Sequence, residues 1–259
     1  MKRKVKELKR IARGNLQGHF LGLIRALVFC DLIVALIETP FSMMTNDVPF
    51  SPTNIIYYVA ILLITIVSVV LTVGQYCLHL RIARNGKLHL SELFYPLRYD
   101  ATRLIITEAI LFVIRLIGLA PIIGAIAIVS FYEGLEMYLI AIVLALLGCL
   151  LTLYIEATFG LIYFVLIDNE ELSGIACIKK ALRMVKGYKG RLLYLLASFL
   201  GISILMLFTF GLAILWIHPY MMQTTTLFYM DITGELDEVL AQKRKQEPTP
   251  EPVVIDSYV

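Results

Sequence analysis

The fold is decided by one apolar stretch near the carboxyl end of the chain, residues 192–230, which reads LLYLLASFLGISILMLFTFGLAILWIHPYMMQTTTLFYM. The stretch contains no Asp, Glu, Lys or Arg. As one straight helix it would be about 60 Å long, twice the thickness of a bilayer's hydrocarbon core. It must therefore reverse direction within lipid, and Thr209-Phe210-Gly211 is the place where the sequence favours a turn. We predict two short membrane spans, at 192–208 and 211–230.

The composition of the whole chain indicates an integral membrane protein. Its 259 residues are 59% hydrophobic, with a mean hydropathy of +0.81, whereas a soluble domain is closer to half apolar. Four further apolar stretches are long enough to cross a bilayer, at 20–40, 55–80, 104–129 and 138–167. Together with the terminal pair they predict an all-α, polytopic membrane helix bundle with six transmembrane helices.

The orientation follows from the positions of Lys and Arg. These residues crowd into three segments, 1–13, 81–103 and 179–191, and are absent from the two intervening loops, 41–54 and 131–137. Because positively charged loops resist translocation, the three basic segments are predicted to lie in the cytoplasm. We therefore expect a multi-pass protein of the cytoplasmic membrane whose amino terminus is cytoplasmic.

The carboxyl end is predicted to return to the same side. The basic run Lys243-Arg244-Lys245 favours the cytoplasm, and six spans bring it there. Residues 234–259 are polar and contain three closely spaced prolines. This composition predicts a disordered cytoplasmic tail after an integral membrane domain at residues 1–233.

Each basic segment also contains a pattern typical of a short amphipathic helix at a membrane surface. In residues 172–186 apolar side chains recur at spacings of three and four, after Ser173 as a helix cap. The opposite side carries Lys179, Lys180, Arg183 and Lys186. We expect this helix to lie on the cytoplasmic surface, apolar face toward lipid, with these four residues contacting anionic headgroups. Residues 6–13 repeat the pattern and 91–95 give a weaker copy, so three units of interfacial helix plus helical hairpin are predicted.

Three ionisable residues are predicted at one level near the middle of the bilayer. Asp31, Arg115 and Glu156 lie equally far from the cytoplasmic ends of their spans, and each costs about 2.5–3.5 kcal/mol to insert. We predict an intramembrane polar cluster in which the planar guanidinium serves both carboxylates. Such a cluster either fixes how the spans pack or forms a polar path for an ion, a proton or a headgroup.

Catalytic signatures are missing from the sequence. It contains no HExxH, GxSxG or Walker A motif, its four histidines have no metal-ligand spacing, and its four cysteines form no CxxC pair. We therefore expect no enzyme, no metal and no cofactor. The net charge of +3, without a basic stripe interleaved with aromatics, also argues against a nucleic-acid partner.

Most of the chain resembles a known family, and the resemblance is specific in the carboxy-terminal third. The residues that carry the resemblance are Ala181-Leu182-Arg183-Met184-Val185-Lys186-Gly187, Thr209-Phe210-Gly211-Leu212, Leu215-Trp216, Pro219-Tyr220 and Phe228-Tyr229-Met230-Asp231. They are similar to the bacterial integral membrane family known as domain of unknown function 975. Residues 8–18 of this chain also resemble the beginning of that family's sequences. The resemblance implies a multi-pass cytoplasmic-membrane protein with no assigned activity and no catalytic residue, in which Trp216, Pro219 and Tyr220 act as packing and interface anchors.

Two functions remain open at this stage. The leading hypothesis is a non-enzymatic scaffold or sensor that binds anionic headgroups, another membrane protein or a second copy of itself through its basic helices. The alternative is a small transporter or permease-like carrier that uses the buried charges. The third span contains three residues that weaken a helix, Gly118, Pro121 and Gly124. They indicate either an unwound, substrate-binding segment of a carrier or an ordinary kink.

Overall fold

The computed structural model describes residues 2–44, 51–85, 87–98 and 101–246, and over these residues it is helical without strands. Four helices are long and apolar enough to cross a membrane. They are α2 (Phe20–Ser42), α3 (Pro52–Asn85), α5 (Ala101–Phe131) and α6 (Leu135–Phe159), the last of which continues into α7 (Ile162–Asp168). These four correspond to the first four predicted spans, and they make the chain compatible with a membrane location.

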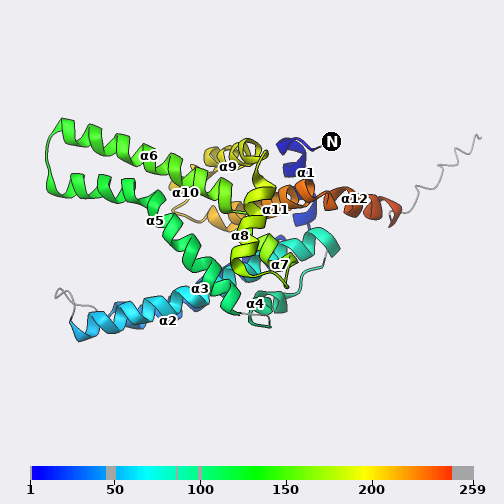
Figure 1. The fold of residues 1–259 in the computed structure, drawn as a ribbon, viewed down its shortest axis with the longest axis horizontal. Helices are drawn as coiled ribbons and strands as arrows, with labels where there is room; N and C mark the ends of the chain where they lie inside the picture. The colour runs from blue at the N-terminus through cyan, green and yellow to red at the C-terminus, as the bar shows by residue number, and fades with distance from the viewer. Residues whose placement is uncertain (1, 45–50, 86, 99–100, 247–259) are drawn as a thin grey trace, which may run out of the picture.

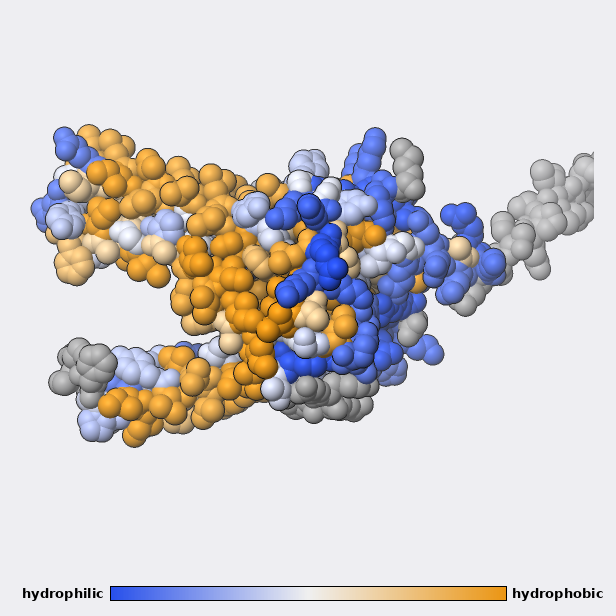
Figure 2. Space-filling view, viewed as in Figure 1, coloured by the Kyte–Doolittle hydropathy of each residue, from blue (hydrophilic) through white to orange (hydrophobic). Residues whose placement is uncertain are grey.

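The four long helices form two hairpins, α2–α3 and α5–α6, which extend as two arms toward the same side (Figure 1). Large apolar side chains are exposed along both arms, as is expected of a surface that faces lipid. The remaining helices form a body at the other end. Figure 2 shows hydrophobic residues along the arms and where they join the body, and hydrophilic residues gathered on the end of the body away from the arms.

Helix α5 bends along its length (Figure 1) but stays continuous through the glycine- and proline-containing segment. Pro121 lacks the N–H that would bond to the preceding turn, which accounts for the bend. Gly118 lies against Thr152 of α6, so its missing side chain lets the two helices approach closely. This segment is therefore an ordinary kink in a continuous helix, and it is not unwound as a carrier's binding segment would be.

A third hairpin consists of α9 (Lys189–Ser203), α10 (Leu205–Phe208) and α11 (Ile214–Thr233). The chain reverses at the predicted place, where Phe210 and Gly211 have positive φ angles of 49° and 86°. Gly211 donates from its backbone to Met206 at 2.8 Å, and Thr209 accepts from the backbone of Ala213 at 3.0 Å. The turn of this hairpin stops well short of the tips of the two arms (Figure 1).

The six-span expectation is not confirmed, because α9 and α11 are not among the four long apolar helices. The second half of α11, from Met222 to Asp231, lies inside the body instead. Leu227, Phe228 and Met230 are fully buried there, in the largest cluster of core residues. This part of the stretch is therefore covered by protein and belongs to the core of the body.

The two basic amphipathic helices are present where the sequence predicts them, as α1 (Val5–Leu16) and α8 (Gly174–Val185). Ser173 caps α8 by accepting from the Ala176 backbone at 3.3 Å. Their apolar faces, however, pack on protein: α1 lies against α11, and α8 against α5, α6 and α7. Lipid-facing interfacial helices are thus not confirmed. The weaker middle copy forms η1 (Leu90–Phe94) and α4 (Tyr95–Arg98) beside α3.

The predicted disordered tail is partly wrong. Its first residues form α12 (Glu235–Gln246), whose Leu236 and Val239 are buried against the body. A helix here is favoured by the acidic residues of its first turn and the basic residues of its last turn, which complement the helix dipole. The rest of the predicted tail, 247–259, lies outside the described residues.

Candidate functional site

A cluster of polar side chains is present around Arg115, with a different membership from the predicted one. Arg115 donates from Nη1 to Glu108 Oε1 at 2.7 Å and from Nε to Glu156 Oε1 at 3.3 Å. Its Nη2 donates to the hydroxyl of Tyr163 at 3.2 Å, and that hydroxyl donates to Glu108 Oε2 at 2.5 Å. One guanidinium therefore serves two carboxylates, as the sequence predicts, and α5, α6 and α7 are joined by it.

Asp31 is not part of this cluster. It is exposed on α2 and has no hydrogen-bond or ion-pair partner within the described residues, although its charge acts on His218 of α11. Matching depth placed Asp31 with Arg115 in the prediction, but depth does not determine which way a side chain faces around its helix. The signal for the true partner was Glu108, which lies two helical turns before Arg115 on the same face of α5.

Two apolar cavities adjoin this cluster on different sides. One, of about 630 Å³, lies between α3 and α5 and reaches Glu108. The other, of about 320 Å³, lies between α6, α9 and α11 and reaches Glu156 and Tyr76. The polar cluster thus separates two spaces that are lined mainly by hydrophobic side chains.

The body is held together by a second polar network, centred on Asp231. This carboxylate is 2% exposed and accepts from Arg191 at 2.6 Å and from Arg3 at 3.3 Å. Lys2 also donates to the backbone carbonyl of Asp231 at 2.5 Å. Because the three cations come from the amino-terminal segment and from α9, Asp231 ties both to the end of α11.

Arg84 makes a similar junction between α3, α7 and α12. It donates to both oxygens of Asp168 at 2.9 and 2.8 Å and pairs with Glu235. The hydroxyl of Tyr229 donates to Asp168 at 2.8 Å. Burial, together with the nearby Asp168 carboxylate, raises the pKa of Tyr229, so the phenol stays protonated. These contacts orient the body and leave no free catalytic group in this network.

The four residues predicted to contact headgroups lie along α8. Lys179, Arg183 and Lys186 are exposed, whereas Lys180 is half-buried and donates to Asn169 at the end of α7. None of the four has an ion-pair partner within the described residues, where the acidic partners go to Arg3, Arg81, Arg84, Arg115 and Arg191. The exposed three therefore remain candidates for an anionic ligand, while Lys180 has a structural contact.

Helix α1 presents a second basic surface, which we call the α1 basic face and define as Lys4, Lys6, Lys9, Arg10 and Arg13. None of these residues forms an ion pair within the described part of the chain. Lys9 lies 3.9 Å from the ring centroid of Phe199 and donates to the Ser198 carbonyl at 3.2 Å. Burial, with repulsion from Arg13, lowers the pKa of Lys9, as expected where cations crowd without a counter-ion.

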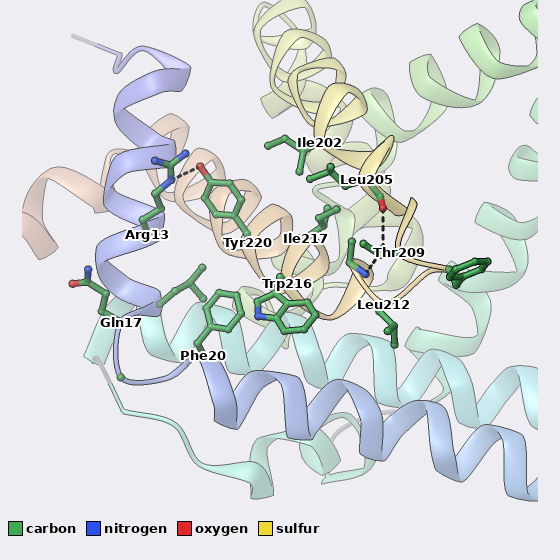
Figure 3. A pocket seen from close by; sticks show the side chains of 14 residues that line it. Arg13, Gln17, Phe20, Ile202, Leu205, Thr209, Leu212, Trp216, Ile217 and Tyr220 are labelled. Atoms are coloured by element: carbon green, nitrogen blue, oxygen red, sulfur yellow. Dashed lines mark hydrogen bonds between the residues drawn. The ribbon is translucent and has the colours of Figure 1, made fainter. Parts of the chain in front are cut away.

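A large cavity of about 1040 Å³ opens beside this face, and we call it the α1–α11 cavity. Figure 3 shows Arg13 and Gln17 at its α1 end and Thr209 and Leu212, at the turn of the third hairpin, at its other end. Between them its walls are apolar, from Leu16, Phe20, Ile202, Leu205, Ala213, Trp216 and Ile217. The family resemblance implies that Trp216 and Tyr220 are packing and interface anchors, and the structure shows that both also line this cavity.

The described residues contain no group of three His, Cys, Asp or Glu side chains that could hold a metal ion. The four cysteines are free, and three of them are buried. The chemistry that these sites support is recognition of charge and of apolar chains.

The chain belongs to the family described as protein of unknown function (DUF975), which matches residues 1–235. This match confirms the resemblance seen in the sequence, which covers most of the chain and is specific in the carboxy-terminal third. No curated protein and no solved structure matches the chain.

Proposed function

We propose that this DUF975 protein is a non-enzymatic lipid-binding protein of the cytoplasmic membrane, acting as a scaffold or sensor whose body recognises anionic headgroups. The observation that carries the proposal is the set of cations on α1 and α8 that lack acidic partners within the described residues. These cations lie on a body attached directly to four long apolar helices. Anionic lipids of the cytoplasmic leaflet attract each such residue by about 1 kcal/mol.

The topology that fits this function has four spans and one re-entrant hairpin. Arg13 of the α1 basic face contacts Tyr220, which places that residue at the level of the basic surface. From Tyr220 to Ile214, where α11 begins, the helix advances about 9 Å, and the turn at Gly211 lies just beyond, so the hairpin reaches only part of the way through the hydrocarbon core. We infer that the third hairpin enters the membrane from the cytoplasmic side and returns to it, so that both termini remain cytoplasmic.

The proposal is tested by the lipids that the protein retains. The protein is purified from vesicles of phosphatidylcholine and phosphatidylglycerol in equal amounts, and bound lipid is identified by native mass spectrometry. We expect phosphatidylglycerol to be retained in excess, with the excess falling at high salt because salt screens exposed charges. Equal retention of both lipids at low salt would contradict the proposal.

A matched pair of variants locates the effect. Replacing Arg183 and Lys186 of α8 by Gln is expected to lower the phosphatidylglycerol excess about fivefold per charge removed. Replacing Arg244 and Lys245 of α12 by Gln removes the same charge from exposed positions at the far end of the body. This control should change the excess much less.

A carrier remains the second candidate, and the two cavities at Glu108 and Glu156 favour it. The pairing of Arg115 with both carboxylates favours a structural cluster, because each of the three charged groups is engaged by a partner within the protein. Uptake or release of labelled ions by protein-containing vesicles, abolished by Arg115→Gln, would support the carrier. Tight vesicles with unchanged permeability would support the scaffold.

A further inference from the structure

We propose that the α1–α11 cavity is a binding site for one anionic phospholipid, with the phosphate on Arg13 and an acyl chain along Trp216. This inference rests on the proposed function and assigns it to a defined site. The cavity joins a charged end on α1 to an apolar end at the hairpin turn (Figure 3). A phospholipid of the cytoplasmic leaflet has the same two parts in the same order.

Arg13 is prepared to hold a phosphate. Its Nε donates to the Tyr220 hydroxyl at 3.1 Å, and its guanidinium carbon lies 5.4 Å from the centroid of the same ring. The two terminal nitrogens have no hydrogen-bond partner within the described residues, and the side chain is exposed. A guanidinium fixed through Nε, with both terminal N–H groups free, suits two parallel hydrogen bonds to phosphate oxygens.

The charge around Arg13 selects an anionic ligand. A second depression, of about 540 Å³, continues from Arg13 along α1 and is lined by Lys4, Lys6, Lys9 and Arg10. Its only acidic lining residue, Glu7, lies 3.6 Å from Arg3 and is engaged there. A headgroup with net negative charge is therefore favoured over a zwitterionic one, whose ammonium these cations would repel.

The apolar part of the cavity suits an acyl chain. Its walls come from α2, α9, α10 and α11, and its one hydroxyl, on Thr209, is engaged with Leu205 and Ala213 at the turn. The indole N–H of Trp216 is the remaining polar group, so this part of the cavity offers few hydrogen-bond partners to a polar ligand. Because Trp216 lines this part and is 55% exposed, it contacts whatever occupies the space.

Trp216 also provides the measurement, because it is the single tryptophan of the chain. The protein is reconstituted in phosphatidylcholine vesicles that contain increasing fractions of phosphatidylglycerol or phosphatidylcholine with brominated acyl chains. Bromine quenches tryptophan fluorescence only in contact. We expect brominated phosphatidylglycerol to quench Trp216 at a lower mole fraction than brominated phosphatidylcholine, above the common background from surrounding lipid.

Three variants separate the site from general attraction to the basic surface. Arg13→Gln should weaken the preference for phosphatidylglycerol about fivefold. Lys179→Gln removes the same charge from α8, outside both the cavity and the depression along α1, and should weaken it less. Ala213→Phe fills the cavity without changing charge and should also remove the preference. Circular dichroism and the unfolding midpoint identify any variant that misfolds.

The results distinguish a failure of the lipid site from a failure of the proposed function. Equal losses in Arg13→Gln and Lys179→Gln would overturn the site while leaving the proposed function intact. A preference that survives Ala213→Phe would overturn the acyl-chain part of the site. If the unmodified protein shows no preference for brominated phosphatidylglycerol but retains phosphatidylglycerol after purification, the site is wrong and the proposed function stands. If both measurements show no preference, both fail.

Discussion

The α5–α6 hairpin and the α9–α11 hairpin have the same arrangement of helices but differ in length and in what covers their apolar side chains. Each follows a short helix or helical turn of the body and reverses once, but α5 and α6 have 31 and 25 residues whereas α9 and α11 have 15 and 20. Large apolar residues of α5 and α6 are exposed along the arm, while those of α11 from Met222 onward are buried in the body. An uncharged stretch therefore does not reveal whether lipid or protein covers it.

The polar contacts of the two hairpins explain the difference. In α5–α6 the network around Arg115 lies near the root, and the helices beyond it carry no charge until the tip. In α9–α11 the network around Asp231 holds the end of the hairpin to the amino-terminal segment. The carboxyl half of α11 is thereby fixed inside the body, and only the half near Gly211 is free to enter lipid.

The largest effect is expected from Asp231→Asn, which releases the third hairpin from the body. The change leaves Arg3 and Arg191, whose side chains are 17% and 20% exposed, without their shared carboxylate. We expect a loss of about 3–5 kcal/mol in the free energy of unfolding. Denaturant titration in detergent micelles measures it. Asp237→Asn, at a partner of Arg3 that is 63% exposed, is the control and should cost less than about 1 kcal/mol.

A smaller effect is expected at the root of α5–α6. Glu108→Gln removes a carboxylate that is 15% exposed and is shared by Arg115 and Tyr163, so it should cost about 1.5–3 kcal/mol. Glu156→Gln affects a carboxylate that is 44% exposed, and should cost less than about 1 kcal/mol. The same titration compares them. Equal costs would mean that Glu156 is as important to the cluster as Glu108.

The close contact between α5 and α6 gives a third comparison. A Cβ on Gly148 would lie 2.5 Å from Ile122 Cγ1, so Gly148→Ala must push the helices apart. Crowding costs about 1–3 kcal/mol and the gain in helix propensity returns about 1 kcal/mol, which leaves a net loss of about 0–2 kcal/mol. Gly124→Ala, with no atom within 4 Å of the added group, should be neutral or stabilising.

The smallest effect is expected at the turn of the third hairpin. Gly211 has a φ angle of 86°, which an alanine adopts only with strain, so Gly211→Ala should cost about 1 kcal/mol. Gly201→Ala, within helix α9 and in open space, should instead stabilise the protein by about 0.5–1 kcal/mol. A stabilising Gly211→Ala would show that the turn is not formed as described.

Much of the architecture could be predicted from local patterns. Helices α1 and α8 follow from apolar spacings of three and four, the Ser173 cap from its position, and the reversal from Gly211. These features depend on residues close together in the sequence. Hydropathy also identified the four long helices, because lipid imposes a length that a sequence must match.

The remaining features depend on contacts between distant segments. An apolar residue such as Phe228 has the same hydropathy whether protein or lipid covers it. Hydropathy therefore predicts a sixth span at 211–230, although the second half of that segment lies in the core of the body. Depth along a span placed Asp31 with Arg115, but the direction of each side chain depends on helix rotation, which hydropathy does not encode. The pairing of Arg13 with Tyr220 crosses more than two hundred residues, and no local pattern predicts it.

The most direct test of the re-entrant hairpin is the accessibility of its turn. In a cysteine-free background, Phe210→Cys and Tyr132→Cys, at the turns of the third hairpin and of α5–α6, are treated on intact cells with a membrane-impermeant maleimide. We predict that Tyr132→Cys reacts and Phe210→Cys does not, because the turn at Phe210 ends inside the membrane. Reaction of Phe210→Cys from outside would contradict this account and restore six full spans.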